Sequence, residues 1–392
     1  MEKRAVYIVS AVRTPIGSLG GSLASVSAPK LGATAIKAAL ERAGVEPGRI
    51  QEVFMGNVLT ANVGQAPANQ ASIYAGIPTS VPCTTVNKVC ASGMKAIMLG
   101  AQSIALGEND LVLAGGMESM SNTPYYLDKA RSGYRLGHGQ VIDGIIRDGL
   151  WDPYKDYHMG NAGEICSAKY GFTREMQDAY AAASYRKAAA AHEGGWAKKE
   201  IVPVEIQGKT TISITDDEDY TKVNFDKMAS LKPAFQKDGT ITAANAPGIN
   251  DGAAALVLAG EDIVKALGLK PLARIVSYGD ASQDPEWFTT TPTLAMNIAL
   301  KRAGLSVGDI DYFEINEAFS CVAMANAKDM GIPEDRLNIW GGAVALGHPI
   351  GCSGARITVT LTSILHQQSA RYGLAGICNG GGGASALLIE RV

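Results

Sequence analysis

The sequence predicts an α/β protein in which two copies of one strand–helix unit pack together. Short apolar strands alternate with helical stretches in residues 1–120, a pattern typical of a sheet covered by helices on both faces. Residues 271–392 repeat that pattern at an almost constant distance along the chain. At 392 residues, the chain is long enough for about two or three domain-sized units.

The internal repeat is carried by short matching segments. Three pairs correspond at an offset of 260 or 261 residues: 39–45 with 299–305, 90–93 with 351–354, and 113–115 with 374–376. Agreement at nearly one offset over such distances is hard to obtain by chance. We therefore predict a duplicated core with ligand sites where the copies meet, although the repeat says nothing about chemistry.

The individual elements follow from hydrophobic patterning and helix-end signals. In the first copy we expect strands at 5–9, 53–56 and 111–114 and helices at 30–43 and 91–106. Gly44 marks the end of the earlier helix. A central region fits neither copy and contains an amphipathic helix at 173–192 with Thr173 as its N-cap. The expected domains are a first half at 1–120 completed by 251–270, an inserted loop domain at 121–250 and a second half at 271–392.

Composition and charge exclude several classes of protein. The formal net charge is −3, which offers no basic surface for nucleic acid. We find no apolar run of the roughly 18 residues that a membrane helix needs, so no membrane partner is expected. The six cysteines lack zinc or CxxC spacing, which fits reduced thiols. Because the N-terminus passes directly into a strand and 389–392 is no peroxisomal address, we expect a cytoplasmic protein.

The candidate nucleophile is Cys90, at the end of a polar turn just before the helix expected at 91–106. Unpaired N–H groups and the helix dipole lower the pKa of a thiol at such a position and favour the thiolate. Ser92 and Gly93 are small, so a substrate can approach the sulfur closely. By itself, a cysteine before a helix is more often a small buried hydrophobe.

Three later stretches supply groups that complete a site. Asn316 follows the strand expected at 312–315 and occupies the N-cap position of the next helix. His348 lies in a glycine-flanked loop before a proline, which holds it in an extended turn. Cys378 ends a strand before four glycines, 380–383, whose N–H groups can face a ligand. Taken singly, these features also read as a cap, a loop histidine and a hairpin turn.

Taken together, these groups favour acyl transfer through a thiol. A thiolate nucleophile needs a neighbouring base, and a second thiol can remove or return a proton. Asn316 and His348 can donate to a developing oxyanion. The backbone N–H groups of Cys90 and Gly380 can do the same. No metal-ligand set or phosphate loop competes for these residues.

These stretches resemble the motifs of the thiolase family, specifically its short-chain biosynthetic type, over nearly the full length. The matching motifs are 87–93, 316–319, 347–351 and 378–383. The resemblance implies an α/β thiolase fold of two similar βαβαβαββ halves, with five-stranded mixed sheets in a layered αβαβα core and an inserted loop domain that binds coenzyme A. It also implies a homotetramer built as a dimer of dimers.

The resemblance further implies a reversible ping-pong Claisen condensation of two acetyl-CoA molecules to acetoacetyl-CoA and CoA. Cys90, activated by His348, would become acetylated and release CoA. Cys378 would then deprotonate the second acetyl-CoA, whose enolate oxygen would be held by His348 and by a water on Asn316. The carbonyl oxygen of acetyl-Cys90 would lie against the N–H groups of Cys90 and Gly380. No cofactor is implied beyond coenzyme A as substrate and product.

Contacts to coenzyme A are implied by matching positions, namely Leu150, His158, Met159, Lys222, Leu231, Ala234, Phe235, Ala243, Pro247, Phe288, Ala318 and Phe319. Pro247 departs from the family, which often has serine there. Because proline offers neither hydroxyl nor N–H, we expect a weaker or rerouted pantetheine contact. Two segments also resemble the potassium-binding segments of one eukaryotic subgroup of the family. The residues implied in binding potassium are Tyr220, Tyr278, Asp280 and Ala281. The alternative is that 278–282 is an ordinary loop at the end of a strand.

Two rival functions stay open from the sequence. A degradative 3-ketoacyl-CoA thiolase would run the same residues in reverse on long chains, although 157–160 is typical of the short-chain type. A non-catalytic acyl-CoA or lipid-carrier protein on this scaffold would be free to lose a catalytic cysteine, whereas this chain keeps Cys90, His348 and Cys378. A papain-like cysteine hydrolase has no role for a second cysteine in a glycine turn.

Overall fold

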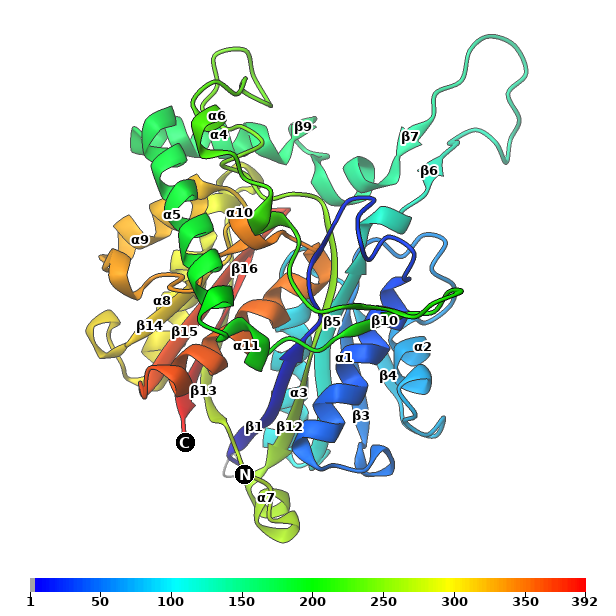
Figure 1. Cartoon of the computed structure of the whole chain (residues 1–392), viewed down its shortest axis with the longest axis vertical. Helices are drawn as coiled ribbons and strands as arrows, with labels where there is room; N and C mark the ends of the chain where they lie inside the picture. Colours follow the sequence, from blue (N-terminus) through cyan, green and yellow to red (C-terminus); the bar gives the residue numbers. More distant parts are fainter. Residues whose placement is uncertain (1–3) are drawn as a thin grey trace.

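A mixed β-sheet forms the centre of the molecule (Figure 1). The computed structural model describes residues 4–392. Within these residues the sheet has ten strands, nine of them in the order β14-β15-β16-β13-β1-β12-β5-β3-β4. The first half supplies β1 (Val6–Arg13), β2 (Gly17–Ser18), β3 (Glu52–Gly56), β4 (Cys83–Val86), β5 (Leu111–Ser119) and β12 (Asn250–Gly260). The second half supplies β13 (Ala273–Ser282), β14 (Tyr312–Ile315), β15 (Tyr372–Asn379) and β16 (Gly383–Arg391).

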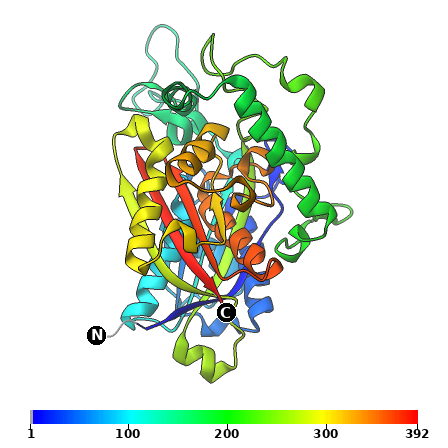
Figure 2. The same cartoon turned by 90° about the vertical axis from the view of Figure 1, so that its left-hand side faces the viewer.

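The helices form three layers around this sheet. Helices α3 (Ser92–Leu106) and α11 (Ile350–Gln367) share one apolar core with strands of both halves, so they form the middle layer. On the outside of the first half lie α1 (Ala28–Ala43) and α2 (Pro67–Tyr74). Figure 2 turns the second half toward the viewer, with α8 (Thr291–Ala303) and α9 (Ser320–Met330) in front of its strands. The predicted layered α/β fold is confirmed.

The two middle helices approach each other through glycines related by the repeat. A Cβ atom on Gly354 would lie 2.6 Å from the backbone nitrogen of Met94, and one on Gly93 would lie 2.8 Å from that of Ala355. Neither position can carry a side chain without separating the helices. The predicted correspondence of 90–93 with 351–354 therefore coincides with a close contact between the two halves.

The second half departs from the expected five strands. Within the described residues it contributes four, and a single parallel bridge between Phe313 and Leu337 takes the place of the fifth. The side chain of Asn338 continues that pairing. The Ile315 N–H donates to Asn338 Oδ1, and Asn338 Nδ2 donates to the Ile315 carbonyl oxygen, both at 2.9 Å. Because Asn338 has a φ of 45°, its backbone leaves the extended conformation and a side-chain amide replaces a strand.

The residues between β5 and β12 cover one end of this core. Helices α4 (Met159–Tyr170) and α6 (Phe225–Met228) lie at the top of Figure 1, where the loop between β6 (Tyr125–Tyr126) and β7 (Ile142–Asp143) projects away from the body. The limits proposed for this region, 121 and 250, stay a prediction. Other elements outside the sheet are α5 (Arg174–Glu193), α7 (Glu261–Leu267), α10 (Ala343–Leu346), β8 (Trp151–Asp152), β9 (Tyr157–His158), β10 (Val204–Ile206) and β11 (Ile212–Ile214).

Several helix ends agree with the sequence-based signals. Gly44 ends α1 in the left-handed conformation, and its repeat partner Gly304 ends α8 in the same way. Thr173 caps α5 by accepting the backbone N–H of Met176. The cap predicted at Asn316 is wrong, because α9 begins at Ser320 and the intervening residues form an irregular segment.

One apolar segment was also misjudged from the sequence. Val89–Leu106 is the one helix among residues 4–392 that is long and apolar enough to cross a membrane by length and composition, with a mean hydropathy of 1.4. The expectation of no such run was therefore wrong. The fold explains the composition, because α3 lies between the two halves and packs against apolar residues on both sides.

We expect Gly354→Ala to lower the free energy of unfolding by about 1–3 kcal/mol, because the added methyl group must push α3 away from α11. Urea unfolding at fixed protein concentration measures the change. The matched control is Gly48→Ala, where the nearest atom to a new Cβ is Cγ of Pro78 at 3.9 Å. A Gly354→Ala protein as stable as the wild type would contradict the packing constraint.

Candidate active site

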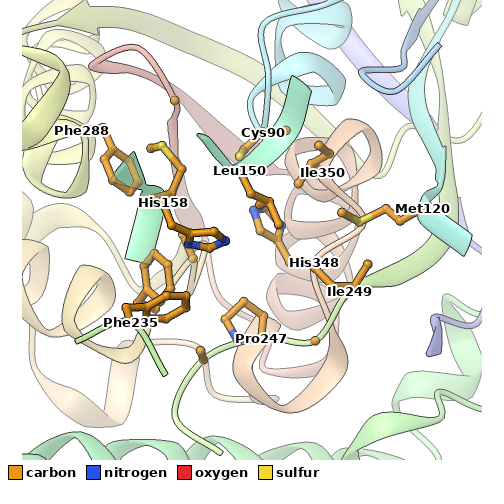
Figure 3. Close-up of a pocket in the computed structure, with 17 residues that line it drawn as sticks. Cys90, Met120, Leu150, His158, Phe235, Pro247, Ile249, Phe288, His348 and Ile350 are labelled. Carbon is orange, nitrogen blue, oxygen red and sulfur yellow. The ribbon is translucent and has the colours of Figure 1, made fainter. Parts of the chain in front are cut away.

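An apolar cavity of about 270 Å³ lies where the two halves and the inserted region meet (Figure 3). The first half contributes Cys90 and Met120, and the second half contributes His348 and Gly380. The complete wall consists of Cys90, Met120, Gly149, Leu150, His158, Met159, Phe235, Ala246, Pro247, Gly248, Ile249, Phe288, Ala318, Phe319, His348, Ile350 and Gly380.

Cys90 is held at the start of α3 by a short, hydrogen-bonded loop. The Ser92 hydroxyl accepts the N–H of Lys88 and donates to the carbonyl oxygen of Val89, whose φ is 46°. Burial raises the pKa of the Cys90 thiol to about 12, although the backbone N–H groups of Gly380 and of Cys90 itself oppose this shift. The predicted lowering of this pKa is therefore wrong for the free protein: desolvation outweighs the helix terminus. The resting thiol is protonated and needs a base.

His348 lies two residues before α11 and is buried. Burial, together with a smaller effect of the Arg356 charge, lowers its pKa to about 3, so the imidazole is neutral. Its Nδ1 is 2.6 Å from the Ser353 hydroxyl, which also lies 3.0 Å from the carbonyl oxygen of Pro349. That hydroxyl can donate to either group, so it is compatible with both tautomers of the ring. Neutral His348 can accept a proton or donate one at Nε2.

Asn316 and Cys378 are fully buried behind the cavity wall. Nδ2 of Asn316 is 3.5 Å from Nε2 of His348, so the asparagine faces the imidazole instead of capping a helix. Cys378 packs with Met159 and Phe319, which do line the cavity. Burial raises the pKa of Cys378 well above its usual value, and the charge of a Cys90 thiolate raises it further. The two thiols therefore lie within electrostatic reach of each other.

The glycine turn between β15 and β16 brings a backbone donor to Cys90. Gly380 lines the cavity, and its N–H is directed at the Cys90 thiol. The next two residues, Gly381 and Gly382, have φ angles of 82° and 86°, which other residues rarely adopt. The Gly380 N–H therefore lies beside the Cys90 thiol, and its role as an oxyanion donor stays a prediction.

Most residues implied in coenzyme A binding line one of two adjoining cavities. His158 stacks on Phe235 with ring centroids 4.7 Å apart, and Phe235 meets Phe319 edge to face at 5.8 Å. The first cavity is lined by Leu150, His158, Met159, Phe235, Pro247, Phe288, Ala318 and Phe319. A second cavity of about 360 Å³ shares Ala246 and Gly248 with the first and is lined by Lys222, Leu231 and Ala243. Ala234 lines neither and donates its N–H to the Ile241 carbonyl oxygen.

The four residues implied in potassium binding belong to separate regions. Tyr220 stacks on His192 with ring centroids 4.2 Å apart. Tyr278, Asp280 and Ala281 lie in β13 and pair with β16. The carboxylate of Asp280 accepts hydrogen bonds from the ammonium groups of Lys88 and Lys95. The potassium site was expected from a tyrosine oxygen and backbone carbonyls, which these side-chain contacts do not test, so it stays a prediction.

Comparison with known proteins decides the family. Residues 6–262 match the family model described as "Thiolase, N-terminal domain", and residues 269–391 match "Thiolase, C-terminal domain". The chain belongs to the thiolase family.

Named relatives cover this thiolase almost completely. Acetyl-CoA acetyltransferase 1 of Arabidopsis thaliana is 56% identical over 394 residues, which is 100% of this chain and 95% of the relative. Acetyl-CoA acetyltransferase of Schizosaccharomyces pombe is 55% identical and covers 99% of both chains. The solved Acat5 thiolase from Ascaris suum, in complex with coenzyme A, has a TM-score of 0.95 at 47% identity and covers 99% of this chain and 100% of its own. The Bacillus anthracis acetyl-CoA acetyltransferase has a TM-score of 0.98 at 40% identity over both full chains.

Three residues that support the thiolase site were missed from the sequence. Asn250 accepts the His348 N–H through Oδ1 at 3.0 Å. Glu118 is buried at the end of β5 and accepts the Gly351 N–H at 2.9 Å, tying the first half to the start of α11; burial raises its pKa to about 7. Neither had a signal in the sequence. Ser353 did, because the repeat aligns it with Ser92 and both hydroxyls bind backbone before a helix.

The neutrality of His348 predicts a pH-dependent stability. Because its folded pKa of about 3 lies below the ordinary value, the unfolded chain takes up a proton that the folded chain refuses. This contribution is fully present above about pH 6.5 and is lost as the pH falls toward 3. Between pH 7.5 and 5.5 the wild type should lose about 1.4 kcal/mol more unfolding free energy than His348→Asn. Urea titrations at both pH values measure this difference, and parallel losses would contradict a neutral buried imidazole.

Proposed function

We propose that this thiolase is an acetyl-CoA C-acetyltransferase that reversibly condenses two acetyl-CoA molecules to acetoacetyl-CoA and CoA. As a thiolase it is an acyltransferase, and the Arabidopsis and fission-yeast relatives are named acetyl-CoA acetyltransferases. The coenzyme A in the Ascaris suum structure supports CoA as the carrier of the acyl group. The observation that carries the proposal is one apolar cavity lined by Cys90, neutral His348 and Gly380.

In the first half-reaction the Cys90 proton passes to Nε2 of His348 while the sulfur attacks the thioester carbonyl. The high pKa of the thiol makes this base necessary, and the low pKa of the imidazole makes it a good proton donor to the departing CoA sulfur. The developing oxyanion is stabilised by the N–H groups of Cys90 and Gly380. Loss of one such donor typically costs about 10²–10³ in rate.

In the second half-reaction Cys378, a thiol in the resting protein, first passes its proton to Nε2 of His348, and the resulting thiolate removes a proton from the methyl group of the incoming acetyl-CoA. Its raised pKa makes that thiolate a strong base. The enolate oxygen is held by Nε2–H of His348 and by a water on Asn316. The carbanion then attacks acetyl-Cys90, the departing Cys90 thiolate receives the proton from Cys378, and His348 returns its extra proton to Cys378. Met159 and Cys378 share one apolar cluster, so we expect the flexible Met159 side chain to move when substrate reaches Cys378.

The size and lining of the cavity support a short acyl group. A volume of about 270 Å³ is small, and rigid aromatic rings of Phe235, Phe288 and Phe319 limit its extension. Lys222 lines the adjoining cavity; its ammonium group pairs with Glu218 at 2.8 Å and would turn from that carboxylate to bind the phosphate end of coenzyme A. Pro247 lines the wall between these regions and supplies no donor, so pantetheine contacts shift to neighbouring groups. The reaction needs no further cofactor.

We also propose a cytoplasmic homotetramer. The projecting loop between β6 and β7 exposes several large apolar side chains, namely Tyr125, Leu127, Tyr134, Leu136 and Val141, with Leu136 fully exposed. Such a loop is suited to contact between copies of the chain. The location is supported by a relative from Gibberella zeae, 55% identical over 99% of this chain, whose name includes "cytosolic".

Separate half-reactions test the roles of the two cysteines. With labelled acetyl-CoA in a single turnover, we expect label on the peptide that contains Cys90. Cys90→Ala should take up no label and should form no acetoacetyl-CoA, because the nucleophile is gone. Cys378→Ala should still take up label and release CoA but should lose condensation. Acetyl transfer by Cys90→Ala would contradict Cys90 as the nucleophile. It would equally contradict a non-catalytic carrier protein, because such a protein transfers no acetyl group.

Chain length tests the choice between short-chain and degradative thiolases. We expect thiolysis of acetoacetyl-CoA to exceed thiolysis of 3-ketohexadecanoyl-CoA by more than about tenfold in kcat/KM, because the cavity wall stops a long chain. Initial rates with CoA as the second substrate measure the ratio. Equal values for both substrates would favour the degradative activity.

A further inference from the structure

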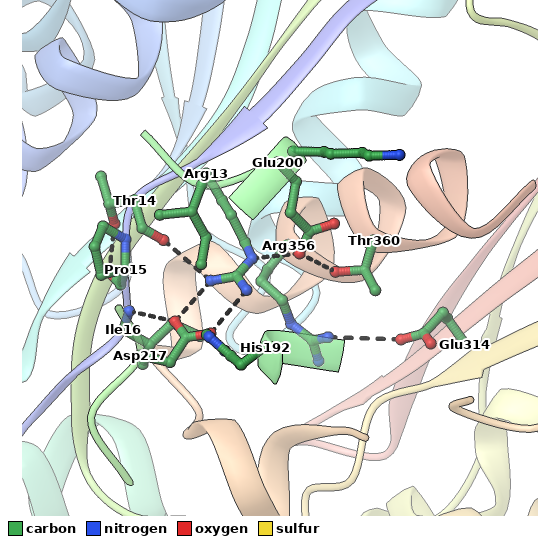
Figure 4. Close-up of polar contacts among 12 residues, drawn as sticks. Arg13, Thr14, Pro15, Ile16, His192, Glu200, Asp217, Glu314, Arg356 and Thr360 are labelled. Carbon is green, nitrogen blue, oxygen red and sulfur yellow. Dashed lines mark hydrogen bonds and ion pairs between the residues drawn. The ribbon is translucent and has the colours of Figure 1, made fainter. Parts of the chain in front are cut away.

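A network of buried charges lies outside the cavity, between the inserted region and α11 (Figure 4). Arg13, at the end of β1, donates to Asp217 at 2.7 and 2.8 Å and to Glu200 at 2.5 Å. Glu200 also accepts the hydroxyl of Thr360 on α11 at 3.0 Å. These hydrogen bonds satisfy Arg13 and anchor the inserted region, so this part of the network has a structural explanation.

The neighbouring pair of Arg356 and Glu314 is different. Their closest N–O distance is 3.5 Å, and their side chains are 1% and 0% exposed. Among residues 4–392, Nη1 of Arg356 and both carboxyl oxygens of Glu314 find no hydrogen-bond partner. A buried ion pair of such geometry regains little of its desolvation cost, and apolar replacements are often as stable or more so. Stability is therefore a poor explanation for this pair.

The position of the Arg356–Glu314 pair in the fold offers a better explanation for it. Glu314 lies on β14, two residues before Asn316, and Arg356 lies on α11, eight residues after His348. Within α11, Arg356 follows Ser353 by one turn, and Ser353 contacts Nδ1 of His348. The pair thus bridges the two elements that present Asn316 and His348 to each other at 3.5 Å.

We propose that Arg356 is a positioning residue for acyl transfer, which through Glu314 fixes α11 against β14 so that His348 faces Asn316. This role rests on the proposed acetyltransferase chemistry, in which His348 serves both half-reactions. A small shift of α11 would move the imidazole away from Cys90 and from the water on Asn316. Misplacement of a reacting group by a fraction of an ångström to one ångström lowers rates by about 10- to 100-fold.

The charge of Arg356 gives this role a second, separable signature. His348 faces Asn316 just after β14, Asn250 from β12, Ser353 from α11 and the thiol of Cys90. The carboxyl group of Glu118 lies at the adjacent turn of α11. Of the charged groups around the imidazole, Arg356 lowers its pKa. Burial raises the pKa of Glu314 to about 8, so the carboxyl group only partly cancels the guanidinium at neutral pH.

Three variants and one control separate positioning from stability in the intact protein. Arg356→Met removes the charge, Arg356→Lys keeps it, and Arg356→Met combined with Glu314→Leu removes both members of the pair. Thr360→Val is the control, because it removes a hydrogen bond of the same helix without touching the pair. Thermal unfolding, kcat and KM for acetoacetyl-CoA thiolysis, and the pH dependence of Cys90 alkylation by iodoacetamide are measured for each.

Arg356→Met should lower kcat by about 10- to 100-fold with little change in KM, because binding groups are untouched. Loss of the cation should raise the pKa of His348. The pH below which Cys90 alkylation slows, here called the acid limb, should therefore rise by about one to three units. Arg356→Lys should restore most of the wild-type kcat and most of the wild-type position of the acid limb. The double variant should recover thermal stability but keep the low kcat and the displaced limb. Thr360→Val should lose stability while keeping the wild-type kcat and limb.

The positioning role would be overturned if either Arg356→Met or the double variant kept the wild-type kcat and the wild-type acid limb of alkylation. Recovery of kcat in the double variant would also overturn it and would assign Arg356 to stability alone. If Arg356→Met fails to fold, the double variant and Arg356→Lys decide between these outcomes. Absence of thiolysis in the wild type would instead refute the proposed function, and the alkylation limb would still report on Arg356 and His348.

Discussion

The close approach of α3 and α11 at Gly93 and Gly354 is the constraint on which the site depends. Both helices begin at the same end of the core, one just after Cys90 and the other just after His348. Any side chain at the crossing would separate these starting points. The duplication therefore has a chemical consequence: equivalent corners of two similar halves carry a thiol on one side and a neutral imidazole on the other, which we propose as nucleophile and base. The inserted region closes the cavity above them.

Burial then sets the protonation states in that cavity. The helix terminus alone would favour a thiolate at Cys90, yet desolvation dominates and leaves a protonated thiol beside a neutral imidazole. Such a pair avoids two buried charges in the resting protein and forms them only as the reaction proceeds. Preorganised donors, chiefly the Gly380 N–H, replace the water that an exposed site would use. The buried cation of Arg356 fits the same logic, because it disfavours a charged His348 at rest.

Much of the site could be predicted from local sequence motifs. Features that depend on contacts between distant segments could not. Cys90, His348 and Gly380 could be located because each stands at a strand or helix corner marked by glycine, and the repeat placed the corners together. Asn316 was placed near the site but given the wrong local role, because an asparagine after a strand resembles a helix N-cap, whereas α9 begins only at Ser320. The pKa of Cys90 depends on burial by other segments. Glu118, Asn250 and Arg356 act through partners from distant segments or from α11, which composition and spacing do not reveal.

The central claim is that the acyl group is carried by Cys90 in a pocket whose oxyanion donors come from both halves. A crystal structure of the protein after exposure to acetyl-CoA tests it most directly. The account predicts an acetyl group on the Cys90 sulfur, with its carbonyl oxygen within hydrogen-bond distance of the Gly380 N–H. An acetyl group on any other residue, or a carbonyl oxygen turned away from that donor, would contradict it.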